Sequence, residues 1–145
     1  MAITQAMCTS FKAEVLLGVH DFRPDASATS DVFKLALYSA GAALSAGTTA
    51  YVTDSESVGT GYTAGGSALT NLGVTTGDST GFLDFSDLTF STVTVNAAGC
   101  LIYNSSQSNK AVCVLDFGGN KSSSSGTFTI QFPTAASSTA IIRIS

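Results

Sequence analysis

The stretch CLIYNSSQSNKAVCVLDF, residues 100–117, decides the fold class of this chain. Two almost uninterrupted apolar runs, residues 100–104 and 111–117, flank the polar segment 105–110. Apolar runs separated by a short polar connection are typical of the two strands of a β-hairpin. Because both faces of each run are apolar, the pattern predicts a hairpin near the centre of a β-sandwich.

Shorter runs with clean alternation surround this hairpin. In residues 32–38, large apolar side chains alternate with Lys34, Ala36 and Tyr38, which predicts a half-buried strand. Residues 127–132 alternate in the same way and predict a second such strand. Further strands are predicted at residues 49–53, 69–75, 80–85, 88–90, 92–95 and 140–144.

Segments rich in glycine and small polar residues separate the predicted strands. Turns are predicted at residues 77–78 and 96–99, and a polar loop at 118–126. The segment GTGYTAGG, residues 59–66, lacks both the G-x-x-x-x-G-K-[ST] and the G-x-G-x-x-G spacing of nucleotide-binding loops. Its glycines are therefore expected to allow positive φ in tight turns, or the close approach of two backbones.

The start of the chain has a different pattern. Residues 9–18 predict a short helix that Thr9 or Ser10 caps and that Gly18 ends in the left-handed conformation. Helical spacing suggests one apolar face made of Phe11, Val15, Leu16 and Leu17.

These patterns together predict the fold class. About eight short strands, with turn signals roughly every 8–15 residues, favour an all-β, jelly-roll-like β-sandwich with Greek-key connections. We expect residues 1–30 to form an N-terminal arm with the short helix, and residues 31–145 to form the sandwich, within a single domain overall.

Composition excludes several classes of partner. Charged residues make up 11% of the 145 residues, against about 25% in typical soluble domains. The net charge is −4 and the six Lys and Arg residues are scattered, so a nucleic-acid surface is not expected. No apolar run approaches the roughly 18–20 residues of a membrane-spanning helix, and no basic cluster suggests binding to a membrane surface.

The chain offers little chemistry to an enzyme. Its single histidine, His20, precedes Asp21, but no G-x-S-x-G motif supplies a nucleophile, and neighbouring residues in an extended segment point in opposite directions. The closest acidic pairs, Asp54 with Glu56 and Asp84 with Asp87, do not match a calcium-binding loop, although a bound Ca²⁺ stays an alternative. No catalytic residue, metal ligand or cofactor is predicted.

The three cysteines, Cys8, Cys100 and Cys113, cannot all pair with one another, and none belongs to a C-x-x-C motif. They are expected to be reduced, partly buried thiols in a protein made in the cytoplasm, with a Cys100–Cys113 disulfide as the alternative. Residues 1–7 have neither the positive charge nor the apolar core of a signal peptide.

Six segments in this order give the chain a family resemblance. Together they resemble a family of small virion structural proteins of tailed bacteriophages. The segments are SFKAEVLLGVHDF (10–22), VFKLALY (32–38), GTGYTAGG (59–66), LIYNS (101–105), AVCVLDFG (111–118) and GTFTIQFP (126–133).

The resemblance implies a non-enzymatic cement, or decoration, protein with a jelly-roll fold. Such a protein is made in the bacterial cytoplasm, lies on the capsid exterior and bridges neighbouring major capsid protein subunits, often as a homodimer. The residues expected to contact the capsid or a second copy are Met7, Phe11, Leu16, Leu17, His20, Phe22 and Tyr62.

A second hypothesis is a binding module associated with the tail or a fibre. A β-sandwich of this kind could bind carbohydrate or a host surface through the aromatic side chains Tyr51, Tyr62 and Tyr103, although the chain lacks tryptophan.

Overall fold

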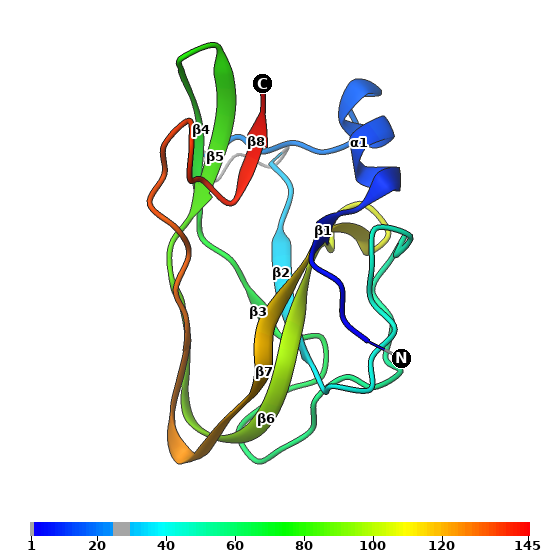
Figure 1. Ribbon diagram of the computed structural model, residues 1–145, viewed down its shortest axis with the longest axis vertical. Helices are drawn as coiled ribbons and strands as arrows, with labels where there is room; N and C mark the ends of the chain where they lie inside the picture. The colour runs from blue at the N-terminus through cyan, green and yellow to red at the C-terminus, as the bar shows by residue number, and fades with distance from the viewer. Residues whose placement is uncertain (1, 25–29) are drawn as a thin grey trace.

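Two antiparallel sheets and one helix form the computed structural model, which describes residues 2–24 and 30–145 (Figure 1). The predicted all-β sandwich with about eight strands is confirmed. The helix is α1 (Thr9–Leu16). The larger sheet has the order β1 (Ala6–Met7), β7 (Lys110–Ile130), β6 (Leu88–Asn104), β2 (Phe33–Tyr38), β3 (Ser67–Ala68). The smaller has the order β4 (Asn71–Gly77), β5 (Thr80–Phe85), β8 (Ile142–Ile144).

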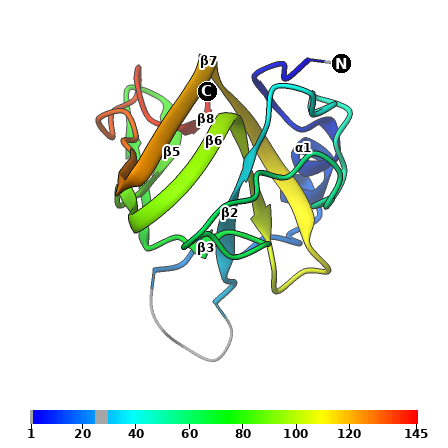
Figure 2. The same cartoon turned by 90° about the horizontal axis from the view of Figure 1, so that it is seen from below.

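The predicted central hairpin is confirmed and is longer than expected. Strands β6 and β7 pair from Asn104 and Lys110 to Leu88 and Ile130, and they curve side by side over the molecule (Figure 2). The predicted turn at 96–99 and the loop at 118–126 are therefore wrong. Register shifts absorb the glycines and small polar residues of both segments as bulges within the strands, so these residues bend the ladder without ending it.

Strand β2 lies between β6 and β3, and it is buried more completely than its alternation predicted. Ala36 and Tyr38, expected on a solvent-facing side, are buried because residues that lead into the glycine-rich segment cross over them. In particular, the Tyr38 hydroxyl donates to the carbonyl of Val52. The strand predicted at 49–53 is wrong, since only an isolated bridge forms there, between Ala50 and Lys110.

The small sheet agrees better with the sequence. The strands predicted at 69–75, 80–85 and 140–144 correspond to β4, β5 and β8, with shifted ends. Phe85 of β5 packs against Phe33 of β2 with ring centroids 6.0 Å apart, so the two sheets share one apolar core.

Helix α1 begins where β1 leaves the sheet. The N-cap is Cys8, whose backbone N–H donates to Val112, and no side chain caps the helix, so the prediction of a Thr9 or Ser10 cap is wrong. The predicted end is confirmed, because Gly18 has φ +70°.

The predicted single apolar face of α1 is only partly present. Phe11 is buried and Val15 is half-buried, whereas Leu16 and Leu17 are exposed. At 100° per residue, Val15 lies about 40° from Phe11 around the helix, but Leu16 lies about 140° away.

Part of the expected N-terminal arm is packed against the sandwich. Ala6 and Met7 pair with β7, and the backbone N–H of Thr4 donates to Leu44. Residues 1 and 25–29 of the expected 1–30 segment lie outside the described residues.

The three cysteines are buried free thiols, as expected. Burial raises the pKa of Cys8 to about 11 and that of Cys113 to about 12. The alternative Cys100–Cys113 disulfide is not formed, because Cys100 is registered with Leu115 and Cys113 with Ile102.

Candidate functional site

An apolar groove of about 210 Å³ opens between α1 and the small sheet, at the end of the molecule where both appear in Figure 1. No charged side chain is among its lining residues in the part of the chain that the structure describes. The groove is lined by Phe11, Val15, Phe22, Val74, Gly81, Phe82, Leu83, Ile142 and Ile144.

Two residues of the groove lining, and two residues that follow Val15 of that lining on the chain, have exposed apolar side chains. Leu16 and Leu17 at the end of α1 are 89% and 77% exposed, and Val74 and Ile144 of the small sheet are 58% and 56% exposed. Single exposed aliphatic residues are ordinary, but several around an apolar groove mark a contact surface. We call the groove and these four side chains the α1–β8 surface.

The expected contact residues are divided between this surface and the interior. Leu16 and Leu17 belong to the surface and are mostly exposed. Met7 is half-buried in β1 and packs against the core. Tyr62 lies on the glycine-rich segment, where its hydroxyl accepts a hydrogen bond from the backbone N–H of Leu37 and its ring packs against Phe90.

The remaining three expected contact residues form one aromatic cluster beneath α1. The ring centroids of Phe11 and His20 are 4.9 Å apart, and those of Phe11 and Phe22 are 5.9 Å apart. Phe22 also stacks on Phe33 of β2 at 4.3 Å. Phe11 and the side chain of His20 are buried by the chain itself, so they support the α1–β8 surface from within.

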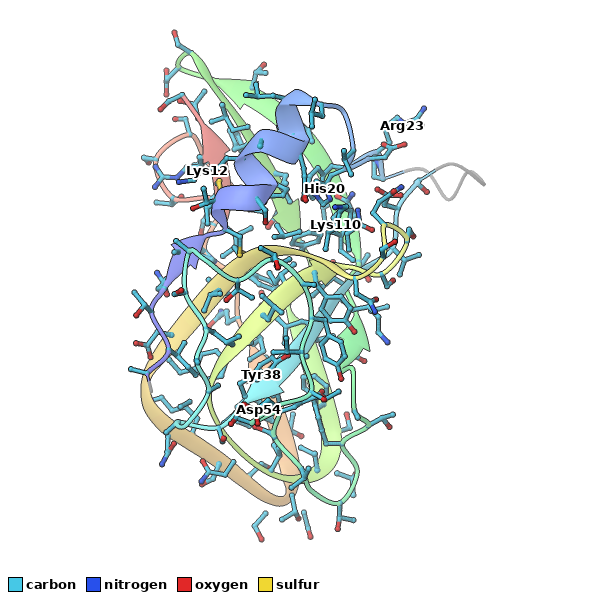
Figure 3. The ribbon with its side chains drawn as sticks, turned by 90° about the vertical axis from the view of Figure 1, so that its right-hand side faces the viewer. Lys12, His20, Arg23, Tyr38, Asp54 and Lys110 are labelled. Carbon is cyan, nitrogen blue, oxygen red and sulfur yellow. The ribbon has the colours of Figure 1, made fainter. Side chains whose placement is uncertain are left out.

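A polar network joins α1 to the turn between β6 and β7. His20 Nε2 lies 2.7 Å from Glu14 Oε2, and Lys110 Nζ lies 3.1 Å from Glu14 Oε1. Asn104 Nδ2 lies 3.0 Å from His20 Nδ1 and donates to Asp31 Oδ2 at 2.7 Å. Figure 3 shows His20 and Lys110 close together below α1. Because the Asn104 amide donates to Nδ1, the imidazole carries its proton on Nε2 and donates it to Glu14.

The electrostatics of this network favour an ionised Glu14. Burial raises the pKa of Glu14, but the hydrogen bonds from His20 and Lys110 and the positive charge of Lys110 outweigh it and leave the pKa below its ordinary value. The network therefore connects the helix to the larger sheet through an ion pair between Glu14 and Lys110.

The neighbouring pair His20 and Asp21 does not form a dyad. The carboxylate of Asp21 pairs with Arg23, whose hydrogen bonds lower the pKa of Asp21 to about 2. No hydroxyl or thiol is among the hydrogen-bond partners of His20 in the described residues. This geometry gives His20 a structural role in positioning α1.

A second carboxylate, Glu56, is surrounded by neutral donors. The hydroxyls of Tyr51 and Tyr62 and the backbone N–H of Gly65 all donate to it, the last at 2.7 Å. Tyr103 stacks on Tyr51 at 4.8 Å and donates to the Gly65 carbonyl. Burial, followed by the nearby Glu56 charge, raises the pKa of each of these tyrosines. We call these five residues the Glu56 cluster.

The glycine-rich segment closes over the larger sheet beside this cluster. A Cβ on Gly66 would lie 1.8 Å from the carbonyl oxygen of Leu35, and one on Gly59 would lie 1.8 Å from that of Thr94. The predicted close approach of two backbones is therefore confirmed, as is positive φ at Gly61, Gly65 and Gly66.

The acidic pairs singled out in the sequence have other partners. Glu56 belongs to the cluster above, and Asp87 accepts a hydrogen bond from the backbone N–H of Phe132. Over residues 2–24 and 30–145, His, Cys, Asp and Glu side chains form no group of three or more that could hold a metal ion. Within the same ranges, no helix is both long and apolar enough to cross a membrane.

Several residues of the α1–β8 surface were not predicted from the sequence. Val74, Phe82 and Ile144 lie in short strands whose alternation does not show which face is covered. The edge strand β8 places the apolar Ile142 and Ile144 on one face, and this was the available signal for a contact surface.

Comparisons with protein-family models, with curated proteins and with solved structures find no match to this chain, so the function has to be argued from its residues and geometry.

Proposed function

We propose that this chain is a non-enzymatic structural protein of a tailed-phage virion. In this proposal it is a cement protein that binds the capsid exterior through the α1–β8 surface and bridges major capsid protein subunits. The observation that carries the proposal is the apolar groove, whose lining includes the exposed Val74 and Ile144, together with Leu16 and Leu17, which follow Val15 of that lining on the chain and are also more than half exposed. The resemblance of the six sequence segments to virion proteins supplies the setting.

The physics of a cement protein suits a surface of this size. A groove of about 210 Å³ is smaller than ligand pockets of about 300–1,000 Å³, so a single contact would be weak. Many copies on a shell add their contacts, because each bridge makes the next contact effectively intramolecular. Low charge limits the desolvation cost when the surface is covered.

The alternative, a carbohydrate-binding module of a tail or fibre, has less support. The hydroxyls of Tyr51, Tyr62 and Tyr103 already donate to Glu56 and to the Gly65 carbonyl. A sugar would have to displace these hydrogen bonds, which leaves the tyrosines poor candidates for recognition.

Two measurements test the proposal. Mass spectrometry of gradient-purified virions should detect the protein, and purified protein should co-sediment with coat shells that lack it. Leu16→Asp should abolish co-sedimentation, because it places a charge within the covered surface. Val58→Asp is the matched control, since Val58 is 88% exposed but lies outside the α1–β8 surface. Absence from the virion, or equal loss with both variants, would contradict the proposal.

A further inference from the structure

The α1–β8 surface includes an open side of the sandwich. Strand β8 is the last strand of the small sheet and pairs with β5, and β1 is an edge strand of the larger sheet. Residues of β1 and of the segment 139–143 line one hollow of about 370 Å³. The edges of the two sheets therefore face each other across unfilled space, beside α1 (Figure 1).

The side chains of β8 differ between its two faces. Ile142 and Ile144 line the apolar groove, whereas Arg143, between them, lines the hollows on the other side. A strand added along the outer edge of β8 would follow the same period of two. Every second side chain of that strand would cover the groove, and the others would lie beside Arg143.

The lining of this edge contains one basic side chain, Arg143, which donates to the carbonyl of Ser137, and the Ser137 hydroxyl in turn donates to Asp78. In the described residues, neither the groove nor the two hollows beside β8 is lined by an Asp or Glu side chain. Arg143 is exposed, and so is Lys12, which precedes Val15 by one turn on α1 (Figure 3). Neither forms an ion pair with any residue that the structure describes. An exposed Arg143 without an ion pair complements an acidic side chain on a partner.

We propose that the outer edge of β8 accepts an extended segment of another protein as an added strand. Backbone hydrogen bonds to β8 hold the segment, its apolar side chains cover the groove, and an acidic side chain pairs with Arg143. The inference rests on the proposed function in one respect, since the coat protein would supply the segment.

A synthetic peptide tests the chemistry without a capsid. A fluorescent eight-residue peptide of alternating Val and Asp should bind the purified chain saturably in an anisotropy titration. The matched Val-Lys peptide should bind at least about tenfold more weakly. Of the two Val-Asp peptides methylated on alternate backbone amides, the one whose methyl groups block the amides facing β8 should lose binding, because it cannot complete the ladder.

Variants of the exposed Arg143 separate charge recognition from folding. Arg143→Glu should weaken binding of the Val-Asp peptide by about tenfold and strengthen binding of the Val-Lys peptide. Arg143→Lys should still bind the Val-Asp peptide more tightly. The thermal midpoints of both variants should match that of the unmodified chain, because the side chain lies on the surface. Hydrogen exchange should show new protection of those β8 amides that point away from β5.

Several results would overturn the inference. These are no saturable binding, equal binding of both peptides, or protection that maps away from β8. A dimer with protected β8 amides in the absence of peptide would also overturn it, by showing that a second copy occupies the edge. Capsid binding that survives both Arg143→Glu and Ile144→Asp would refute the strand-addition site alone. Peptide binding without capsid binding would refute the proposed function alone.

Discussion

Glu14 and Glu56 organise two regions of the molecule with different kinds of partner. Glu14 lies between His20 and Lys110, beside a groove that stays open. Glu56 accepts hydrogen bonds from tyrosine hydroxyls and a backbone amide, beside a segment that touches the larger sheet backbone to backbone. Glu14 therefore lies in a region with an uncovered apolar surface. Glu56 lies in a closed region in which donors of the chain itself form its hydrogen bonds.

The difference indicates that one region of the chain stabilises the fold and another is available to contact a partner. Neutral donors and close backbone contacts fix one geometry around Glu56, so the surrounding structure cannot adjust to a substitution there. The Glu14 region includes a partly exposed cation, Lys110, and side chains of α1 that touch solvent on one side. We expect substitutions near Glu56 to lower the free energy of unfolding, and substitutions on the exposed side of α1 to weaken binding.

The largest effect is expected from Gly66→Ala. The new Cβ would lie 1.8 Å from the Leu35 carbonyl oxygen, so the glycine-rich segment must leave the sheet or distort it. We expect the free energy of unfolding to fall by at least about 4 kcal/mol, measured by urea denaturation.

Gly18→Ala is the matched control in the other region. Gly18 has nearly the same φ, +70° against +72°, but a Cβ there would meet nothing within 4 Å. Only the cost of the left-handed conformation applies, about 1–2 kcal/mol. Equal costs for the two alanine variants would show that the segment around Gly66 is no more rigid than the end of α1.

Removing each carboxylate compares the two regions directly. Glu56→Ala leaves the Tyr51 and Tyr62 hydroxyls and the Gly65 amide without their acceptor, at an expected cost of about 3 kcal/mol. Glu14→Ala leaves the buried Nε2–H of His20 unpaired, but Lys110 can turn to water, so about 1.5 kcal/mol is expected. Chemical denaturation of both variants checks the order, and a larger loss for Glu14→Ala would reverse the comparison.

Sequence pattern predicted the sheets of this molecule better than its carboxylate sites. Alternation and apolar runs located β2, β5 and the hairpin β6–β7, because strand period depends on local burial. The bulges at 96–99 and 118–126 resembled turns, since glycine and serine mark both.

The two carboxylate clusters depend on long-range pairing that no local pattern encodes. Glu14 meets Lys110 across 96 positions of the chain, and Asp31 meets Asn104 across 73. Burial of Tyr38 on the expected polar face of β2 likewise comes from a segment that crosses the strand. The exposure of Leu16 depends on how α1 is rotated, which the short predicted helix could not specify.

The two regions should also respond to opposite ends of the pH scale. Glu14 has a lowered pKa in the folded chain, so its contribution is present above its ordinary pKa of about 4.3 and is lost as pH falls through the folded value. Tyr51 and Tyr62 have raised pKa values, so their contribution is complete below about pH 10 and is lost as pH rises further.

Urea midpoints measured between pH 3 and pH 11 test this pattern. Glu14→Gln should reduce the fall of the urea midpoint at acid pH and leave its fall at alkaline pH unchanged. Tyr51→Phe should reduce only the fall at alkaline pH. If one variant reduces both falls, the two carboxylate regions are coupled and the comparison fails.

The smallest effect on the free energy of unfolding is expected from substitutions at Leu16 and Leu17, where the largest effect on binding is expected. Leu16→Asp combined with Leu17→Asp removes two side chains that are mostly in water, so the free energy of unfolding should change by no more than about 0.5 kcal/mol. Binding of a hydrophobic fluorescent dye to the folded protein should fall, because these exposed apolar side chains directly follow Val15 of the groove lining. Val58→Asp should leave dye binding unchanged. A destabilisation of several kcal/mol in the double variant would instead show that Leu16 and Leu17 belong to the packed interior, and the division between a stabilising region and a contact region would fail.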